Sequence, residues 1–167
     1  MTNLADHSNP YQSPSIPPSS PDESRFRFLP VIVGWAVDFG SSMIVGTVMG
    51  VVLAVQAIAR NPRMTPEDFV KLMSYQPTWF WITGISLGLL CSASGGFVTA
   101  WLARSAVWKH VFAMSLLSVG SSILTLLTNM AIGAFPTWWH FAVALTAIPA
   151  AYFGGWIRVA TQGRATR

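Results

Sequence analysis

Long stretches of this chain carry almost no ionisable side chain. Counting Asp, Glu, Lys, Arg and His, the segment 77–103 has none, 29–59 has only Asp38, and 111–157 has only His140. Runs of about 18 or more apolar residues are long enough to cross a bilayer as a helix. Only 10% of the 167 residues are charged, against about a quarter in a soluble domain. The sequence therefore predicts an all-α membrane protein.

Turn signals divide these stretches into four predicted spans, at about 30–59, 78–103, 111–134 and 138–159. Asn61 and Pro62 end the first span, and Pro136 marks a tight turn between the last two. The expected fold is a four-helix transmembrane bundle. The first span would be about 46 Å long. Because the hydrocarbon core is only about 30 Å thick, this helix must tilt or project from the bilayer.

Polar segments flank and interrupt the predicted membrane domain, 29–160. The segment 1–28 is rich in Pro and Ser, and we predict a disordered cytoplasmic tail because it cannot bury enough apolar surface to fold. The segment 161–167 is predicted to be a basic C-terminal tail. Between the first two spans, Thr65, Pro66 and Asp68 form a helix-start signal. We expect a short amphipathic helix there on the membrane surface, either as a lid over the helix ends or as a binding loop.

Basic residues gather on one side of the predicted membrane domain. Four spans put both termini on one side, together with the loop between spans two and three. That side carries seven basic residues, Arg25, Arg27, Arg104, Lys109, Arg158, Arg164 and Arg167. The other side carries three, Arg60, Arg63 and Lys71. The positive-inside rule therefore favours termini in the cytoplasm and a protein of the cytoplasmic (inner) membrane.

The net charge of +4 suggests which partners to expect. Because the basic residues lie at the span ends, the predicted partners are anionic membrane lipids. No basic patch is interleaved with exposed aromatic residues, so nucleic acid is not expected as a partner.

Small residues recur at every fourth position in several spans. In the second span they are Gly84, Gly88, Ser92, Gly96 and Ala100. The first span has Gly46 and Gly50, and the fourth has Gly154 and Gly155. Residues four apart lie on one face of a helix, and small side chains let a second membrane helix approach closely. These positions are therefore predicted to pack helices together, within one chain or between subunits.

Asp38 is the only acidic residue inside a predicted span, and such residues are functional candidates. It lies about 10 Å from the cytoplasmic boundary of the hydrocarbon. Ser94 of the second span and Ser118 of the third fall at about the same depth, so we expect a polar site formed by these three residues. It could lock the bundle by hydrogen bonds, or by a salt bridge to Arg104 or Lys109. The alternatives are a proton- or ion-handling site and a partner-binding site.

No combination of side chains in the spans is typical of a catalytic or metal site. The serines have no His or Lys base at a matching depth, and no phosphate-binding or paired-carboxylate motif occurs. Cys91 stands alone, without metal-ligand spacing. We interpret His110 and His140 as interfacial residues, and Asn129 with its neighbouring threonines as a helix–helix hydrogen-bonding patch. We therefore expect no cofactor, no metal and no enzymatic activity.

The second and fourth spans end alike, with SGGFV at 94–98 and FGGWI at 153–157. Both spans cross the membrane in the same direction. A duplicated helical hairpin would leave this pattern, although glycine is common in membrane helices in any case.

Three runs resemble a group of small, uncharacterised four-span proteins of the bacterial inner membrane. They are GWAVD at 34–38, TPEDF at 65–69, and SGGFVTAWLAR at 94–104, which is followed by Lys109 and His110. The third run matches the pattern GG-[FY]-V-x-A-x-x-A-R. The resemblance implies a four-span inner-membrane protein and brings no catalytic residues.

Two functions remain open from the sequence. The first is a non-enzymatic bundle that self-associates or assists a larger membrane protein, because the small-residue positions exceed what one hairpin needs. The alternative is a small oligomeric transporter or channel with Asp38 at a polar site in the inner leaflet.

Overall fold

The computed structural model describes residues 26–103, 105–132 and 135–165. Its helices are α1 (Phe28–Arg60), α2 (Pro66–Ser74), α3 (Thr78–Leu102), α4 (Val107–Ile132) and α5 (Thr137–Ala165). All except α2 are long and apolar enough to cross a membrane. The predicted all-α fold, with four spans and a short helix after the first, is confirmed. The predicted disordered tail lies, up to residue 25, outside the described residues.

Two helix ends differ from the predicted spans. α4 begins at Val107, so Lys109 and His110 belong to the helix and not to the connection. The chain turns at Ala106, whose φ of 49° is left-handed, and the Ala106 carbonyl accepts hydrogen bonds from the backbone N–H groups of Lys109 and His110. α5 continues to Ala165 and takes in most of the predicted basic tail, which contains no proline to stop the helix.

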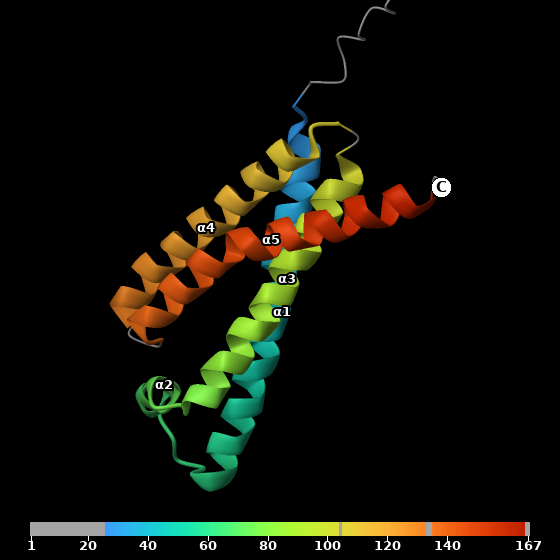
Figure 1. The fold of residues 1–167 in the computed structure, drawn as a ribbon. Coiled ribbons are helices and arrows are strands. Elements are labelled where there is room, and N and C mark those ends of the chain that lie inside the picture. The colour runs from blue at the N-terminus through green and yellow to red at the C-terminus, as the bar shows by residue number, and fades with distance from the viewer. Residues whose placement is uncertain (1–25, 104, 133–134, 166–167) are drawn as a thin grey trace, which may run out of the picture.

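The spanning helices form two hairpins that cross each other. α1 pairs with α3, and α4 pairs with α5. α3 is the central helix, because it packs against α1, α4 and α5. Figure 1 shows the hairpins meeting near the end where α1 begins and diverging toward α2. We call these two ends the N-terminal end and the α2 end of the bundle.

The contact between α1 and α3 depends on two glycines. Gly34 faces the Gly95 carbonyl and the Thr99 side chain so closely that a β-carbon there would overlap them. Gly95 is equally confined, since a β-carbon there would meet the Gly34 carbonyl and the Asp38 side chain. The two helix backbones therefore touch, which is the packing that small residues permit between membrane helices.

Two further glycines join α3 to α5 in a reciprocal pattern. Gly96 lies against the backbone of Ala151, and Gly154 lies against the backbone of Ala93. Each glycine thus meets the alanine that stands three residues before the other glycine. A local two-fold relation between the two helices produces this kind of contact. We use the name glycine crossing for Gly34, Gly95, Gly96 and Gly154 together.

The other predicted packing glycines divide into two groups. Gly84 lies against a side chain of α5, and Gly155 lies against one of α4. By contrast, a β-carbon at Gly46, Gly50 or Gly88 would meet nothing within 4 Å. The prediction that these three glycines pack helices together is therefore wrong within the single chain. The physical reason is that the hairpins have already diverged at their level.

α2 begins at the predicted signal. The Thr65 hydroxyl accepts a hydrogen bond from the Asp68 N–H at 3.2 Å, and the Asp68 carboxylate accepts one from the Thr65 N–H at 3.2 Å. This capping box satisfies two backbone donors that would otherwise lack partners. Phe69 and Met73 then pack against side chains of α1 and α3. α2 therefore covers the end of the α1–α3 hairpin.

Acidification should loosen α2 selectively. Hydrogen bonds from the Thr65 backbone and side chain lower the pKa of the Asp68 carboxyl below its ordinary value of 3.8. A group with a lowered pKa stabilises the folded state above its unfolded pKa, and this stabilisation is lost as the pH falls through the folded pKa. We expect the hydrogen-exchange protection of the α2 amides to fall below about pH 4.

Asp68→Asn is the matched variant for this measurement. It should show weak α2 protection already near neutral pH, because Asn lacks the charge that strengthens the capping bonds. In the wild-type protein, α2 protection that is the same near neutral pH as it is below about pH 4 would contradict the expectation.

Candidate functional site

The Asp38 side chain is buried where α1 meets α3 and α4, and it is 5% exposed. Its Oδ1 accepts a hydrogen bond from the Ser92 hydroxyl at 3.0 Å. Its Oδ2 accepts one from the Ser118 hydroxyl at 2.5 Å. These three residues, which we call the Asp38 cluster, tie three helices together.

Ser118 contacts Asp38 as predicted, but the predicted partner in α3 is wrong. Ser94 is exposed, and its hydroxyl donates to the Leu90 carbonyl of its own helix at 2.8 Å. Ser92, predicted as a packing position, provides the hydroxyl instead. Two residues along a helix correspond to a rotation of about 200°, so the two serines share a depth and face opposite sides. The small-residue stripe that contains Ser92 was the signal for the correct face.

A cavity of about 300 Å³ opens between the two hairpins, on the α2 side of the Asp38 cluster. Its lining includes Asp38 of α1 and Met73 of α2. The wall made by α1 and α3 includes the three unpacked glycines, Gly46, Gly50 and Gly88. α4 and α5 make the opposite wall. We call this cavity the lateral cleft, because it lies between the facing sides of the two hairpins.

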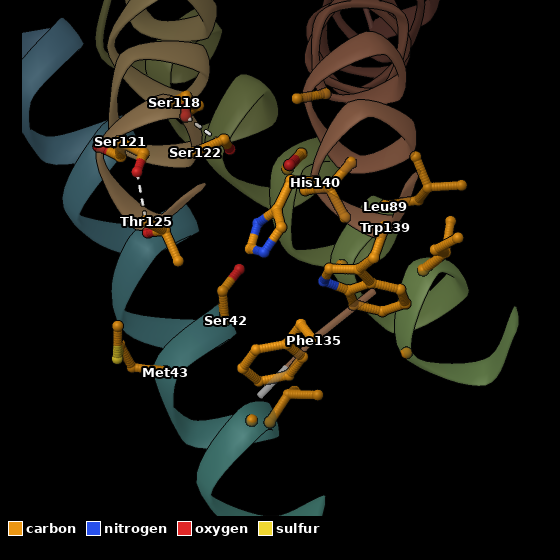
Figure 2. A pocket seen from close by; sticks show the side chains of 18 of the residues that line it. Ser42, Met43, Leu89, Ser118, Ser121, Ser122, Thr125, Phe135, Trp139 and His140 are labelled. Atoms are coloured by element: carbon orange, nitrogen blue, oxygen red, sulfur yellow. Dashed lines mark hydrogen bonds between the residues drawn. The ribbon is translucent and has the colours of Figure 1, made fainter. Parts of the chain in front are cut away.

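Hydroxyl side chains line the α4 wall of the lateral cleft. They are Ser118, Ser121, Ser122 and Thr125. Ser122 donates to the Ser118 carbonyl at 3.0 Å, and Thr125 donates to the Ser121 carbonyl at 2.9 Å (Figure 2). The Ser121 hydroxyl accepts from the Trp35 indole N–H at 3.0 Å. Because their own protons are engaged, Ser122 and Thr125 offer hydrogen-bond acceptors to the cleft.

His140 contributes the least satisfied polar group of this site. It is 5% exposed, and its Nε2 has no hydrogen-bond partner among the described residues. Leaving such a buried group unpaired costs about 1–3 kcal/mol. Figure 2 shows its imidazole directed into the lateral cleft from α5. His140, which the sequence places at the outer boundary of the fourth span, is thus buried within the bundle.

The sequence contained a signal for the burial of His140. Along α5 the small residues Ala147, Ala151 and Gly155 recur at four-residue spacing and face the bundle. Extended toward the start of the helix by one step of four residues and one of three, the same face passes through Val143 and reaches His140. Following that stripe two turns further predicts a histidine that points inward.

His110, the other histidine interpreted as interfacial, is buried at the N-terminal end. It is 1% exposed. Its Nε2 accepts a hydrogen bond from the Arg27 N–H at 3.0 Å, and its ring stacks on Phe26 with 4.7 Å between centroids. His110 thereby holds the start of α1 against α4, which is a structural role.

The remaining sequence candidates do not converge on a second site. The hydroxyls of Thr125 and Thr128 donate to carbonyls of α4 and do not bridge helices, while the Asn129 side chain lies outside the described residues. Cys91 is buried and not in a disulfide. Within the described part of the chain, no group of three or more His, Cys, Asp and Glu residues is placed to hold a metal ion.

Four apolar helices in two crossing hairpins, with a cleft that ends at a buried aspartate, define a multi-pass α-helical membrane protein. Comparison of the chain with protein-family models, curated proteins and solved structures finds no match. Inferences about function therefore rest on the fold and the lateral cleft.

Proposed function

We propose that this chain is a non-enzymatic accessory protein of the bacterial cytoplasmic membrane, and that its lateral cleft takes up an apolar molecule dissolved in the bilayer. The observation that carries this proposal is the open space beside Gly46, Gly50 and Gly88. Each glycine inside a helix costs about 1 kcal/mol relative to alanine. At the glycine crossing that cost is offset by close helix contact, whereas no described helix fills the space beside these three.

Access from the bilayer supports uptake of an apolar molecule. The cleft is lined mainly by apolar side chains and opens between the hairpins. A molecule already dissolved among the lipid chains reaches such a site sideways, without crossing water. Concave, mostly apolar cavities with a few polar groups are the usual form of ligand sites.

The polar groups of the cleft favour binding over catalysis. Both carboxylate oxygens of Asp38 accept hydrogen bonds from serine hydroxyls, so this acid is held as a tie between helices. His140 Nε2 has no described acid or nucleophile within hydrogen-bond reach. A catalytic site needs two or more convergent groups in defined roles.

The distribution of basic residues supports an orientation with both termini in the cytoplasm. By their order in the sequence, seven basic residues fall on the side of the two termini and three on the side of the loop that contains α2. With this orientation the glycine crossing lies in the inner half of the membrane and the lateral cleft opens in the outer half. The basic N-terminal end then contacts anionic lipid headgroups.

One observation favours a transporter as the second candidate. The bundle is closed at the glycine crossing, and the cleft on the α2 side of that crossing reaches Asp38. Transporters that alternate access pass through a state that is open on one side only. This candidate requires that Asp38 exchanges its serine partners for a transported ion or substrate.

Filling the cleft should displace lipid chains from it. Brominated acyl chains quench tryptophan fluorescence on contact, and three of the eight tryptophans line the cleft, namely Trp35, Trp81 and Trp139. We expect Gly88→Leu to reduce quenching in vesicles of brominated lipid. Gly40→Leu is the matched control, because Gly40 also has nothing within 4 Å and lies outside the cleft.

Equal quenching in the wild-type protein and in both variants would contradict uptake by the cleft. The oligomeric state of the same samples gives an independent result. If Gly88→Leu alone dissociates an oligomer, the cleft is the interface for a second copy of the chain and the proposal is overturned.

A further inference from the structure

His140 identifies a particular place within the lateral cleft. Its Nε2 lacks a partner in the described part of the chain, although the residue is only 5% exposed. Leaving a buried group of this kind unpaired is unfavourable. An unpaired nitrogen in the wall of an open cleft indicates that the occupant of the cleft supplies the missing partner.

The neighbours of His140 indicate the chemistry of that partner. Figure 2 shows the imidazole directed toward Ser42 of α1, with Thr125 of α4 beside it. The Thr125 hydroxyl donates its proton to the Ser121 carbonyl, so it can only accept from a ligand. His140 Nε2 donates or accepts according to its tautomer. A hydroxyl group suits this setting, because it donates one hydrogen bond and accepts others.

We propose that the lateral cleft binds a single-chain amphiphile whose hydroxyl head hydrogen-bonds to His140. The inference rests on the proposed function, since it names the class of apolar molecule that the cleft takes up. The alkyl tail lies along the wall of α1 and α3, where Gly46, Gly50 and Gly88 present no β-carbon.

The size and length of the cavity suit a single alkyl chain. Its volume of about 300 Å³ is at the lower limit of ordinary ligand sites, which are about 300–1,000 Å³. Along α1 the lining residues run from Trp35 to Gly50, a length of about 22 Å. An elongated cavity of this kind suits an alkyl chain.

Tryptophan quenching by bromododecanol and bromododecane tests the inference, because the two probes share a tail and differ in the hydroxyl head. The full chain is reconstituted in vesicles of unbrominated lipid, and each probe is titrated. We expect a saturable phase of quenching from the tryptophans of the cleft, with bromododecanol binding roughly fivefold to tenfold more tightly than bromododecane. His140→Leu should remove that preference and leave the two probes equal.

A second pair of variants keeps the test decisive if His140→Leu does not fold. Thr125→Val removes an acceptor that faces the cleft, whereas Thr128→Val removes a hydroxyl of α4 that does not line it. Only Thr125→Val should weaken binding of bromododecanol. Saturable quenching that is equal for both probes and unchanged by the cleft variants would overturn the His140 head site but leave the proposed function standing. The absence of any saturable phase would overturn both.

Discussion

Gly96→Ala is expected to destabilise the bundle by about 3 kcal/mol or more, although it adds a single methyl group. The new β-carbon would overlap the backbone of Ala151. Overpacking in a well-packed interior ordinarily costs about 1–3 kcal/mol, because side chains shift to make room. A helix backbone does not shift so easily, which puts this substitution at the upper limit of that range or beyond. The measurement is the free energy of unfolding in mixed detergent micelles.

Two further glycines provide the comparison. Gly154→Ala should be as damaging as Gly96→Ala, since the contact between α3 and α5 is reciprocal. Gly40→Ala should stabilise the protein by up to about 1 kcal/mol, because alanine is the better helix former and nothing lies within 4 Å. Unfolding free energies that are the same for all three variants would contradict the glycine crossing.

The second large effect is expected at Asp38. Asp38→Ala removes the acceptor of two hydrogen bonds, from Ser92 and Ser118, and should lower the unfolding free energy by about 3 kcal/mol. Asp38→Asn keeps one carbonyl oxygen and should lose about half as much. Ser86→Ala serves as the control, because its exposed hydroxyl bonds only to its own helix.

A double-mutant cycle separates a structural role of Asp38 from a transport role. If Asp38 is a tie between helices, the effects of Asp38→Asn and Ser118→Ala on stability should be strongly non-additive, because the two side chains share one hydrogen bond. Transport predicts in addition that Asp38→Asn changes ion flux or its pH dependence in vesicles. An Asp38→Asn protein that loses stability with unchanged flux would exclude the second candidate function.

The helices could be predicted from the sequence because their causes are local. The absence of charge over 77–103 by itself requires a span there. The start of α2 follows from Thr65, Pro66 and Asp68, which contact one another within a single turn. Where no breaking residue follows a predicted span, as after 159, the helix continues beyond it.

Contacts between helices were predicted less well, because they depend on rotation and crossing angle. The depth of a residue along a span follows from counting residues, and this count correctly predicted Ser118 as a partner of Asp38. The direction in which a side chain points depends on which face of its helix meets a neighbouring helix. This direction distinguishes Ser92, which bonds to Asp38, from Ser94, which bonds to its own helix. Likewise, nothing in the spacing distinguishes Gly96, which touches α5, from Gly88, which faces open space. That difference arises from the divergence of the two hairpins, a property of the whole bundle.

The Asp38 cluster also bears on the order in which the protein is made. α1 leaves the ribosome first, and Asp38 then has no partner from another helix. Ser92 arrives with α3, but Ser118 arrives only with α4. A chain truncated after α3 therefore leaves an acidic group in the bilayer with half of its hydrogen bonds, which is costly in lipid. The same carboxylate that joins the finished helices distinguishes an unfinished chain from a complete one.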